Sequence, residues 1–354
     1  MSAKLLTAAG AVLVALLILE VVLRVFAARI GEPLAPPLPG DIGRYVSHPF
    51  LPYAGRPDAS YELHNPESGG LPPVIRVHNN SYGFRAHEFP ASKNPEDVFV
   101  LAFGGSTTFG IADSNEDTWP EVLERLLLSR YPAKHVQVFN MGMDMATSAV
   151  SVVNLALVGV HLRPDLVIAY EGYNDLAALG WANFRTDHAH FYRNITPEKI
   201  WPGTRRSLPG PLTHLFAVRF IAGLVDEAAG LNSLASYARY TETEANPDRL
   251  FGIQTLLDNL KTMHAMAESA GARTLFATFA FRDGDEGENP LLNDALRRFF
   301  AEERYDYVDL DARIPDRDPS LQFDECHFTQ KGLDLVAQYF ADYIIAHGLV
   351  EPRH

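Results

Sequence analysis

Four short polar segments of this sequence carry side chains suited to nucleophilic catalysis. A serine hydroxyl is a poor nucleophile at neutral pH and needs an adjacent base, which a histidine such as His327 can supply. Asp324 stands three residues before His327 and can hold its ring in the tautomer that acts as a base. Each segment alone also fits an ordinary turn or helix cap, and only their joint occurrence in this order favours a catalytic site. The four segments are Gly104-Gly105-Ser106, Asn140-Met141-Gly142, Gly172-Tyr173-Asn174-Asp175 and Asp324-Glu325-Cys326-His327.

The four segments lie within a regular alternation of predicted strands and helices. Such alternation predicts parallel βαβ units, and hence an α/β fold of three layers, α/β/α, with a five-stranded and mostly parallel sheet. Sites in such sheets form at the carboxyl ends of the strands, so we expect the four segments to meet at one edge. The predicted strands span 97–105, 135–142, 165–172, 272–280 and 307–311, and the predicted helices span 118–131, 146–162, 251–271, 289–303 and 332–348.

The order of these segments resembles the conserved blocks of the SGNH (GDSL-like) hydrolase superfamily, in its membrane-anchored bacterial type. That family carries Ser in its first block, Gly in its second, Asn in a Gly-x-Asn-Asp block, and an Asp-x-x-His block near the carboxyl end. The resemblance covers roughly 97–347 and implies a flavodoxin-like SGNH fold. Gly105 stands where the family has Asp, a position without a catalytic role in the family scheme.

The resemblance also implies roles for individual residues. Ser106 is expected to be the nucleophile, His327 the general base, and Asp324 the acid that orients it. The expected oxyanion hole consists of the backbone N–H groups of Ser106 and Gly142 and the side-chain amide of Asn174. We expect no cofactor and no metal.

Other polar residues have weaker functional interpretations. Asp175 could act as the relay acid, although helix capping is the stronger interpretation. Arg85, in the segment NNSYGFR, is expected to form a structural salt bridge with a carboxylate such as Glu88. A metal site at His188 and His190 is a weaker interpretation than a structural role.

The segment 176–250 has no counterpart in the minimal family fold. It follows Asn174 directly, so we expect it beside the active site as a lid or substrate wall. Its aromatic residues could stack on sugar rings or line an acyl pocket, and equally they could form a satellite core. The candidates for substrate binding are Trp181, Phe184 and Tyr192.

Composition excludes some classes of function. The chain has 354 residues and a formal net charge of −14, so its surface should repel phosphate backbones, and we expect no nucleic-acid partner. Its single cysteine, Cys326, permits neither an intramolecular disulfide nor a cysteine-based zinc site.

The amino terminus, residues 1–29, predicts a transmembrane anchor. After Lys4 the sequence is apolar from 5 to 28 except at Glu20 and Arg24, and a helix of that length would be roughly 36 Å long, enough to cross a hydrocarbon core of about 30 Å. A cleaved signal peptide and a buried helix remain alternatives. We expect the body outside the cytoplasm, in the periplasm, although a bare count of Lys and Arg favours the opposite orientation.

Three functions are compatible with these observations. We expect residues 97–350 to form a hydrolase domain. Between this domain and the anchor we expect a region, residues 30–96, with a proline-rich stalk and a small hairpin. The leading hypothesis is a serine esterase that removes an acyl group, with acetyl as the first candidate, from an extracytoplasmic glycan or lipid through an acyl-serine intermediate. The alternatives are an O-acyltransferase that modifies a cell-surface polysaccharide and a non-catalytic glycan-binding or scaffolding protein. The presence of every expected catalytic group disfavours the last.

Overall fold

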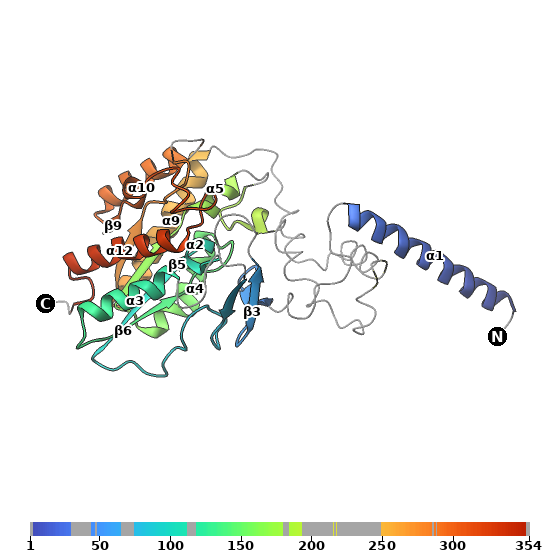
Figure 1. Ribbon diagram of the computed structural model, residues 1–354, viewed down its shortest axis with the longest axis horizontal. Helices are drawn as coiled ribbons and strands as arrows, with labels where there is room; N and C mark the ends of the chain where they lie inside the picture. Colours follow the sequence, from blue (N-terminus) through green and yellow to red (C-terminus); the bar gives the residue numbers. More distant parts are fainter. Residues whose placement is uncertain are drawn as a thin grey trace.

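A five-stranded parallel sheet organises the computed structural model of the chain (Figure 1). Its strands are β5 Asp97–Gly104, β6 His135–Asn140, β7 Leu166–Tyr170, β8 Arg273–Ala277 and β9 Tyr307–Val308. Neighbouring strands pair in parallel in the order β6-β5-β7-β8-β9, which is the flavodoxin-like order. The predicted α/β fold with a five-stranded sheet is therefore confirmed. The structure describes residues 3–29, 44–46, 48–64, 74–111, 118–179, 184–192, 215, 217, 249–284, 287 and 289–351.

The strand order has its switch point at β5. The next strand in the chain, β6, pairs on one side of β5, and β7 pairs on the other. Open α/β sheets bind ligands in the crevice beyond the carboxyl ends of the strands at such a point. The residue after the end of β5 is Gly105, and Ser106 follows it.

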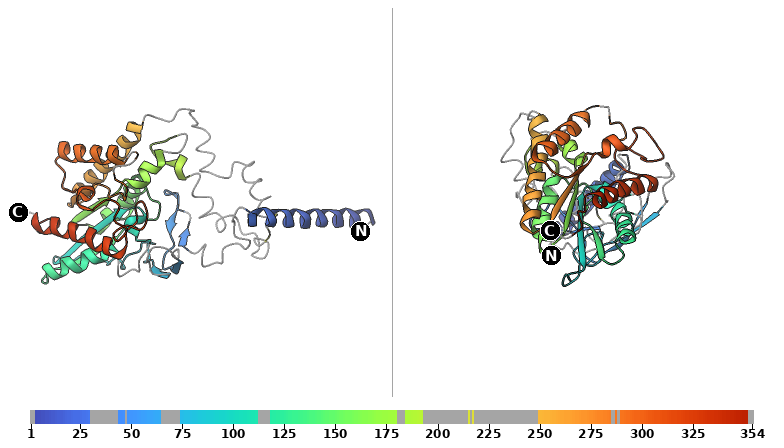
Figure 2. Two further views of the ribbon diagram at one scale, coloured as in Figure 1. Left: turned by 45° about the horizontal axis from the view of Figure 1, so that its top comes forward. Right: turned by 90° about the vertical axis from the view of Figure 1, so that its left-hand side faces the viewer.

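Helices cover both faces of the sheet (Figure 1, Figure 2). On one face α3, which is Trp119–Arg130, packs against α12, which is Gln330–Ala346. On the other face α4, Ser148–Leu157, packs against α9, Arg249–Ser269. The remaining helices of the body are α2 Ser106–Phe109, α5 Tyr173–Leu179, α10 Asn289–Glu303 and α11 Leu310–Arg313.

The core lies between the sheet and these helix layers. Every residue of β5 after Asp97 is buried, as is every residue of β7, because both strands are covered on both faces. Trp119 of α3 stacks on Phe340 of α12 with ring centroids 4.9 Å apart. This contact joins the two helices that cover one face.

Two predicted elements are shorter than expected. The helix predicted over 146–162 ends at Leu157 and is followed by a 3-10 helix, Gly159–Leu162. A Cβ at Gly159 would lie 2.8 Å from a methyl group of Leu155, so glycine permits this tighter turn. The strand predicted over 307–311 ends at Val308, because Asp309 accepts a hydrogen bond from the amide of Ala312 and caps α11.

Two antiparallel strand pairs precede the sheet. They are β1 Tyr45–Val46 with β2 Ala54–Gly55, and β3 Ser60–His64 with β4 Val74–His78. In β4 the side chains alternate between exposed and buried, and Ile75 and Val77 are the buried ones. The β3–β4 pair lies within the 30–96 region, where the sequence predicts a small hairpin.

The amino-terminal segment forms α1, Ala3–Arg29. Its apolar run is interrupted by an ion pair of 2.7 Å between Glu20 and Arg24. Within the part of the chain that the structure describes, no helix has both the length and the apolar content needed to span a membrane, so the membrane span predicted over 5–28 is not supported. Residues 30–43 of the predicted stalk lie outside the described residues.

Candidate active site

Ser106 is the first residue of α2, directly beyond the carboxyl end of β5. The turn from strand to helix brings its side chain to the switch point of the sheet, where 7% of the residue remains exposed. The Oγ atom of Ser106 lies 2.7 Å from Nε2 of His327. These two residues come from positions 221 apart in the sequence.

His327 is oriented by Asp324. The Nδ1 atom of His327 lies 2.7 Å from Oδ2 of Asp324, while Oδ1 of Asp324 accepts the backbone amides of Cys326 and His327 at 3.0 and 2.7 Å. An ionised carboxylate can only accept hydrogen bonds, so Nδ1 of His327 carries the proton. Nε2 is then the acceptor and faces the hydroxyl of Ser106.

The surroundings keep Asp324 ionised. Burial raises the pKa of its carboxyl, but the hydrogen bonds from His327 and from the two backbone amides outweigh burial, and the pKa lies below its ordinary value of 3.8. The neighbouring Cys326 is buried, and burial raises the pKa of its thiol well above the ordinary value. The thiol therefore stays neutral and does not compete as a nucleophile.

Residues 102–335 match the family model described as the GDSL-like lipase/acylhydrolase family. The chain belongs to this family. The resemblance to SGNH hydrolases is therefore confirmed, and the protein is an SGNH-type enzyme that acts on ester bonds. A comparison with curated proteins gave no significant match.

Several solved structures align with most of the chain at low sequence identity. A G-D-S-L family protein from Desulfitobacterium hafniense is 16% identical, with a TM-score of 0.43 over 70% of this chain and 99% of the other. A lipase/acylhydrolase from Enterococcus faecalis is 17% identical, with a TM-score of 0.43 over 73% and 99%. An acetylxylan esterase from Geobacillus stearothermophilus is 13% identical, with a TM-score of 0.42 over 70% and 94%.

Two of the expected oxyanion donors in this GDSL-like enzyme are the backbone N–H of Ser106 itself and the side-chain amide of Asn174, which lies beside it. The backbone N–H of Ser106 is at the start of α2, where a helix has no acceptor of its own for it. The side-chain amide of Asn174 donates to the carbonyl of Ala146 at 2.7 Å. A Cβ at Gly105 would lie only 2.4 Å from the amide nitrogen of Asn174, so this amide is beside the nucleophile. Because an amide group has two N–H donors, Asn174 retains one for a substrate.

The third expected donor, Gly142, has a partner within the protein. Its backbone N–H donates to Oδ1 of Asn140 at 3.0 Å. A Cβ at Gly142 would lie 2.5 Å from the backbone nitrogen of Phe109 and 2.8 Å from the carbonyl carbon of Thr108. The absence of a side chain therefore lets the loop after β6 pack against α2. The structure gives Gly142 this packing role, and its N–H would have to leave Asn140 before it could bind an oxyanion.

The predicted substrate-binding aromatics are buried or lie outside the described residues. Trp181 belongs to the latter group. Tyr192 is 2% exposed, and its hydroxyl accepts from the backbone amide of Thr147 at 2.8 Å and donates to the carbonyl of Met145 at 3.1 Å. Phe184 is buried with its ring 5.0 Å from that of His190. These placements favour structural roles for both residues. Tyr192 supports the loop after β6, and Phe184 packs against its neighbours.

Asp175 and the two histidines of the insertion, His188 and His190, are all buried. Asp175 accepts hydrogen bonds from the backbone and hydroxyl of Ser148 at the start of α4. Neither ring nitrogen of the buried His188 has a hydrogen-bond partner among the described residues, and its Nδ1 lies 4.0 Å from Oδ1 of Asp175. His190 bonds to the carbonyl of Ala178 at 2.9 Å. Asp324, and not Asp175, contacts the imidazole of the site.

Arg85 does not pair with Glu88, the partner suggested by the sequence. Glu88 accepts instead from the amide and hydroxyl of Ser81, both at 2.7 Å. Arg85 is 1% exposed and donates from Nη1 to the carbonyls of Phe109 and Gly110. The sequence contains no signal for these contacts beyond a charged side chain in a short, turn-rich segment.

Two side-chain groups in the described part of the chain have the chemistry of metal ligands. One consists of Asp324, Cys326 and His327 and coincides with the site. In the other, Nε2 of His87 lies 3.2 Å from Glu121 and 3.4 Å from Glu124. Hydrogen bonds from His87 to the two carboxylates raise the pKa of its imidazole to about 10. A protonated His87 satisfies both carboxylates, so we assign no metal there.

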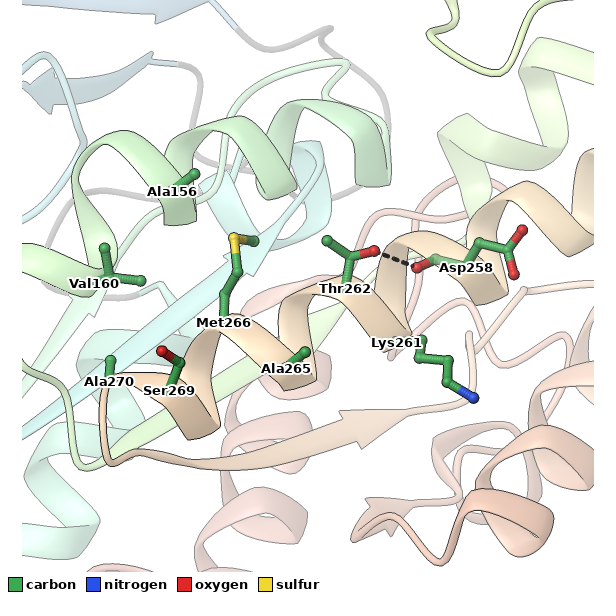
Figure 3. Close-up of a pocket in the computed structure, with 9 residues that line it drawn as sticks. All are labelled: Ala156, Val160, Asp258, Lys261, Thr262, Ala265, Met266, Ser269 and Ala270. Carbon is green, nitrogen blue, oxygen red and sulfur yellow. Dashed lines mark hydrogen bonds between the residues drawn. The ribbon is translucent and has the colours of Figure 1, made fainter.

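A groove away from the site lies between α4 and α9. Figure 3 shows that it is lined by Ala156 and Val160 on one side and by α9 side chains such as Lys261 and Met266 on the other. None of the candidate active-site residues lines it. We assign it no part in the chemistry.

Proposed function

We propose that this protein is a serine esterase that hydrolyses a short acyl ester, with acetyl as the preferred group, through an acyl-Ser106 intermediate. The observation that carries the proposal is the hydrogen-bonded chain from Ser106 through His327 to Asp324, with both links 2.7 Å long. In the first step, Nε2 of His327 takes the proton of the Ser106 hydroxyl as its oxygen attacks the ester carbonyl.

The donors around Ser106 support the next steps. The attack places negative charge on the carbonyl oxygen, and the N–H of Ser106 and the free N–H of Asn174 are the nearest donors for it. His327 then gives its proton to the leaving alcohol, and the acyl group remains on Ser106. Water, deprotonated by His327, releases the acid in the second half of the reaction.

A short acyl group, with acetyl as the first candidate, is the substrate that the sequence favours. We propose an acylated glycan or lipid as the ester that is cleaved, as the sequence predicts. Rates on p-nitrophenyl acetate, butyrate and octanoate test the acyl preference, and a rate that rises with chain length would contradict it.

Replacement of the nucleophile tests the mechanism. Ser106→Ala should abolish hydrolysis of p-nitrophenyl acetate and labelling by a fluorophosphonate probe, while circular dichroism stays unchanged. Ser129→Ala, on the exposed side of α3, is the matched control and should retain full activity. If Ser106→Ala hydrolyses the ester at the rate of the control, Ser106 is not the nucleophile.

Acyl transfer uses the same residues, and partition of the acyl group separates the two reactions. The protein is incubated with an activated acetyl ester, with and without oligosaccharide acceptors. An esterase releases free acetate at the same rate in both cases. Dominant formation of acetylated oligosaccharide, with slow turnover in its absence, would assign the protein as a transferase.

We also propose that the body acts outside the cytoplasm, as an exported enzyme. The support is the sequence of the first residues alone, a basic Lys4 followed by an apolar run, which is the pattern of a secretory signal. Fusion of residues 1–43 to a reporter that folds only outside the cytoplasm tests this. An inactive fusion, beside an active control with a known signal, would overturn the proposed location.

A further inference from the structure

We propose that Arg85 is a positioning residue for the nucleophile, which it serves by holding the one-turn helix that carries Ser106. The inference rests on the proposed function, since it concerns how Ser106 is kept in line with His327. Arg85 contacts neither of these residues in the described contacts and acts through the backbone of α2.

The nucleophile helix cannot be stable by itself. It consists of the four residues from Ser106 to Phe109, which is a single turn. The first turn of a helix fixes several residues for one hydrogen bond, so its formation is unfavourable in isolation. The carbonyl groups at its end also lack partners within the helix and need donors from elsewhere.

The required donors come from two distant segments. Nη1 of Arg85 donates to the carbonyl of Phe109 at 2.8 Å and also to the carbonyl of Gly110. Nδ2 of Asn140, at the end of β6, donates to the carbonyl of Thr108 at 2.9 Å. One turn of helix is thus held at three successive carbonyls, and Arg85 serves two of them.

The local sequence makes room for the guanidinium. Gly110 has a φ of +81°, in the left-handed region that favours glycine. A Cβ at this position would lie 3.2 Å from Nη1 of Arg85 and 2.7 Å from a methyl group of Thr118. A side chain at Gly110 would therefore be strained and would crowd the donor.

Arg85 is itself fixed by the turn that precedes it. Oδ1 of Asn80 accepts the backbone amides of Tyr82 and Phe84, both at 3.0 Å. Nδ2 of Asn80 donates to the carbonyl of His87 at 3.0 Å. One buried amide side chain therefore holds the backbone on both sides of Arg85, which explains the polar, turn-rich segment NNSYGFR in front of the sheet.

The chemistry of arginine suits this position. The guanidinium is 1% exposed, and a buried charge is tolerated only when it is hydrogen-bonded. The two N–H groups of its Nη1 can donate to the two carbonyls at once, and its Cζ atom lies 5.3 Å from the ring centroid of Phe109. A lysine ammonium has the charge but not the planar group over this ring, so the conservative variant should restore only part of the effect.

The test measures kcat and KM on p-nitrophenyl acetate and the rate of fluorophosphonate labelling, each per folded molecule. In Arg85→Met we expect kcat and the labelling rate to fall about 100-fold, because displacement of a reacting atom by about 1 Å has an effect of that order. KM should stay within about threefold, since Arg85 does not contact the substrate. Arg85→Lys should have an intermediate kcat.

Arg273→Met is the matched control. Nη1 of Arg273 likewise donates to a backbone carbonyl, that of Gly348, but it stands at the amino end of β8, away from the site. We expect this variant to lose stability and to keep the wild-type kcat. The control separates the loss of a guanidinium that binds a backbone carbonyl from the loss of the nucleophile's support.

The outcomes decide the proposal. If both Arg85 variants fold and label at the wild-type rate, or if KM and not kcat carries the change, the positioning role is wrong. If Arg85→Met does not fold, Arg85→Lys decides alone, and if neither folds, Arg85 is a general core residue and the proposal is overturned. If the wild-type protein neither reacts with the fluorophosphonate probe nor hydrolyses the ester, this result contradicts the proposed function and not the positioning role.

Discussion

The hydroxyl of Tyr173 donates a hydrogen bond of 2.9 Å to Oε2 of Glu325. Tyr173 directly precedes Asn174, and Glu325 directly follows Asp324. One bond thus joins the start of α5, which carries Asn174, to the loop that carries Asp324 and His327. The two residues are 152 positions apart in the sequence, so this bond helps to set the width of the candidate site.

Tyr173→Phe should lower kcat by about fivefold. The change removes the bond to a charged group but keeps the ring against Phe279, and a bond shared by two partly exposed groups contributes about 1 kcal/mol. Tyr343→Phe is the matched control, because its hydroxyl bonds to Asp306 at 2.9 Å outside the site. Equal kcat values for the two variants would show that the Tyr173–Glu325 bond has no part in the reaction.

Gly105→Ala should reduce kcat by about 10²–10³-fold, which is the usual effect of losing one oxyanion donor. The added Cβ would lie 2.4 Å from the amide nitrogen of Asn174 and would displace it. Gly271→Ala serves as the control: its φ of +86° makes alanine costly for stability, but nothing lies within 4 Å of the new Cβ. A Gly105 variant as active as the Gly271 variant would exclude Asn174 as a donor.

Asp324→Asn should lower kcat by about 10⁴-fold, as loss of the orienting acid does in serine proteases, because an amide no longer selects the required tautomer. The variant should also differ from the wild type in how its stability depends on pH. Since the native pKa of Asp324 lies below 3.8, the stability that this group contributes is present above that value and is lost as pH falls through the native pKa. Melting temperatures of both proteins from about pH 2 to pH 6 should converge at the acid end, and a constant difference would contradict the assignment.

Glu171→Gln should stabilise the protein at alkaline pH. Burial and the neighbouring charge of Asp175 raise the pKa of Glu171 well above 4.5, against the opposing hydrogen bond from Ser151. The native state therefore keeps a proton that the unfolded chain releases, and this contribution is present below the unfolded pKa and lost as pH rises through the native one. Glutamine resembles the protonated acid and cannot ionise.

The measurement is the melting temperature from about pH 5 to pH 9. We expect the wild type to lose stability over this range and the Gln variant to lose less. Glu268→Gln, on the exposed side of α9, should follow the wild type. A Glu171 variant with the same pH dependence as the wild type would mean that the carboxyl is ionised in the native state.

The sheet could be predicted from sequence because its strands are continuous apolar runs. β5 and β7 are buried on both faces, so their composition alone distinguishes them from surface strands. The short β9 was overestimated, because Asp309 begins a helix cap that depends on an amide three residues later. A strand of two residues is too short to show a hydrophobic pattern, so the sequence does not indicate where it ends.

The residues of the candidate site were found for a different reason. Ser106, Gly142 and Asn174 come shortly after strands whose ends meet, and Asp324 and His327 come just before α12. Spacing along the chain could not show what each residue would contact. Gly142 has the expected position, yet its amide bonds to Asn140. Tyr192 was chosen as a candidate for substrate binding, but it is buried and bonds to the loop after β6. Contacts such as these depend on side-chain packing across distant segments.

The separation of Ser106 from His327 has a consequence for biosynthesis. The ribosome completes β5 and Ser106, and it reaches His327 only 221 residues later. At a typical elongation rate of about 5–20 residues per second, Ser106 waits roughly 11–44 s for its partner. A nascent chain that has not reached His327, or one truncated before it, therefore contains Ser106 without the proposed general base. Ester cleavage is in this way coupled to completion of the polypeptide, with no inhibitory segment needed to silence the enzyme while it is being made.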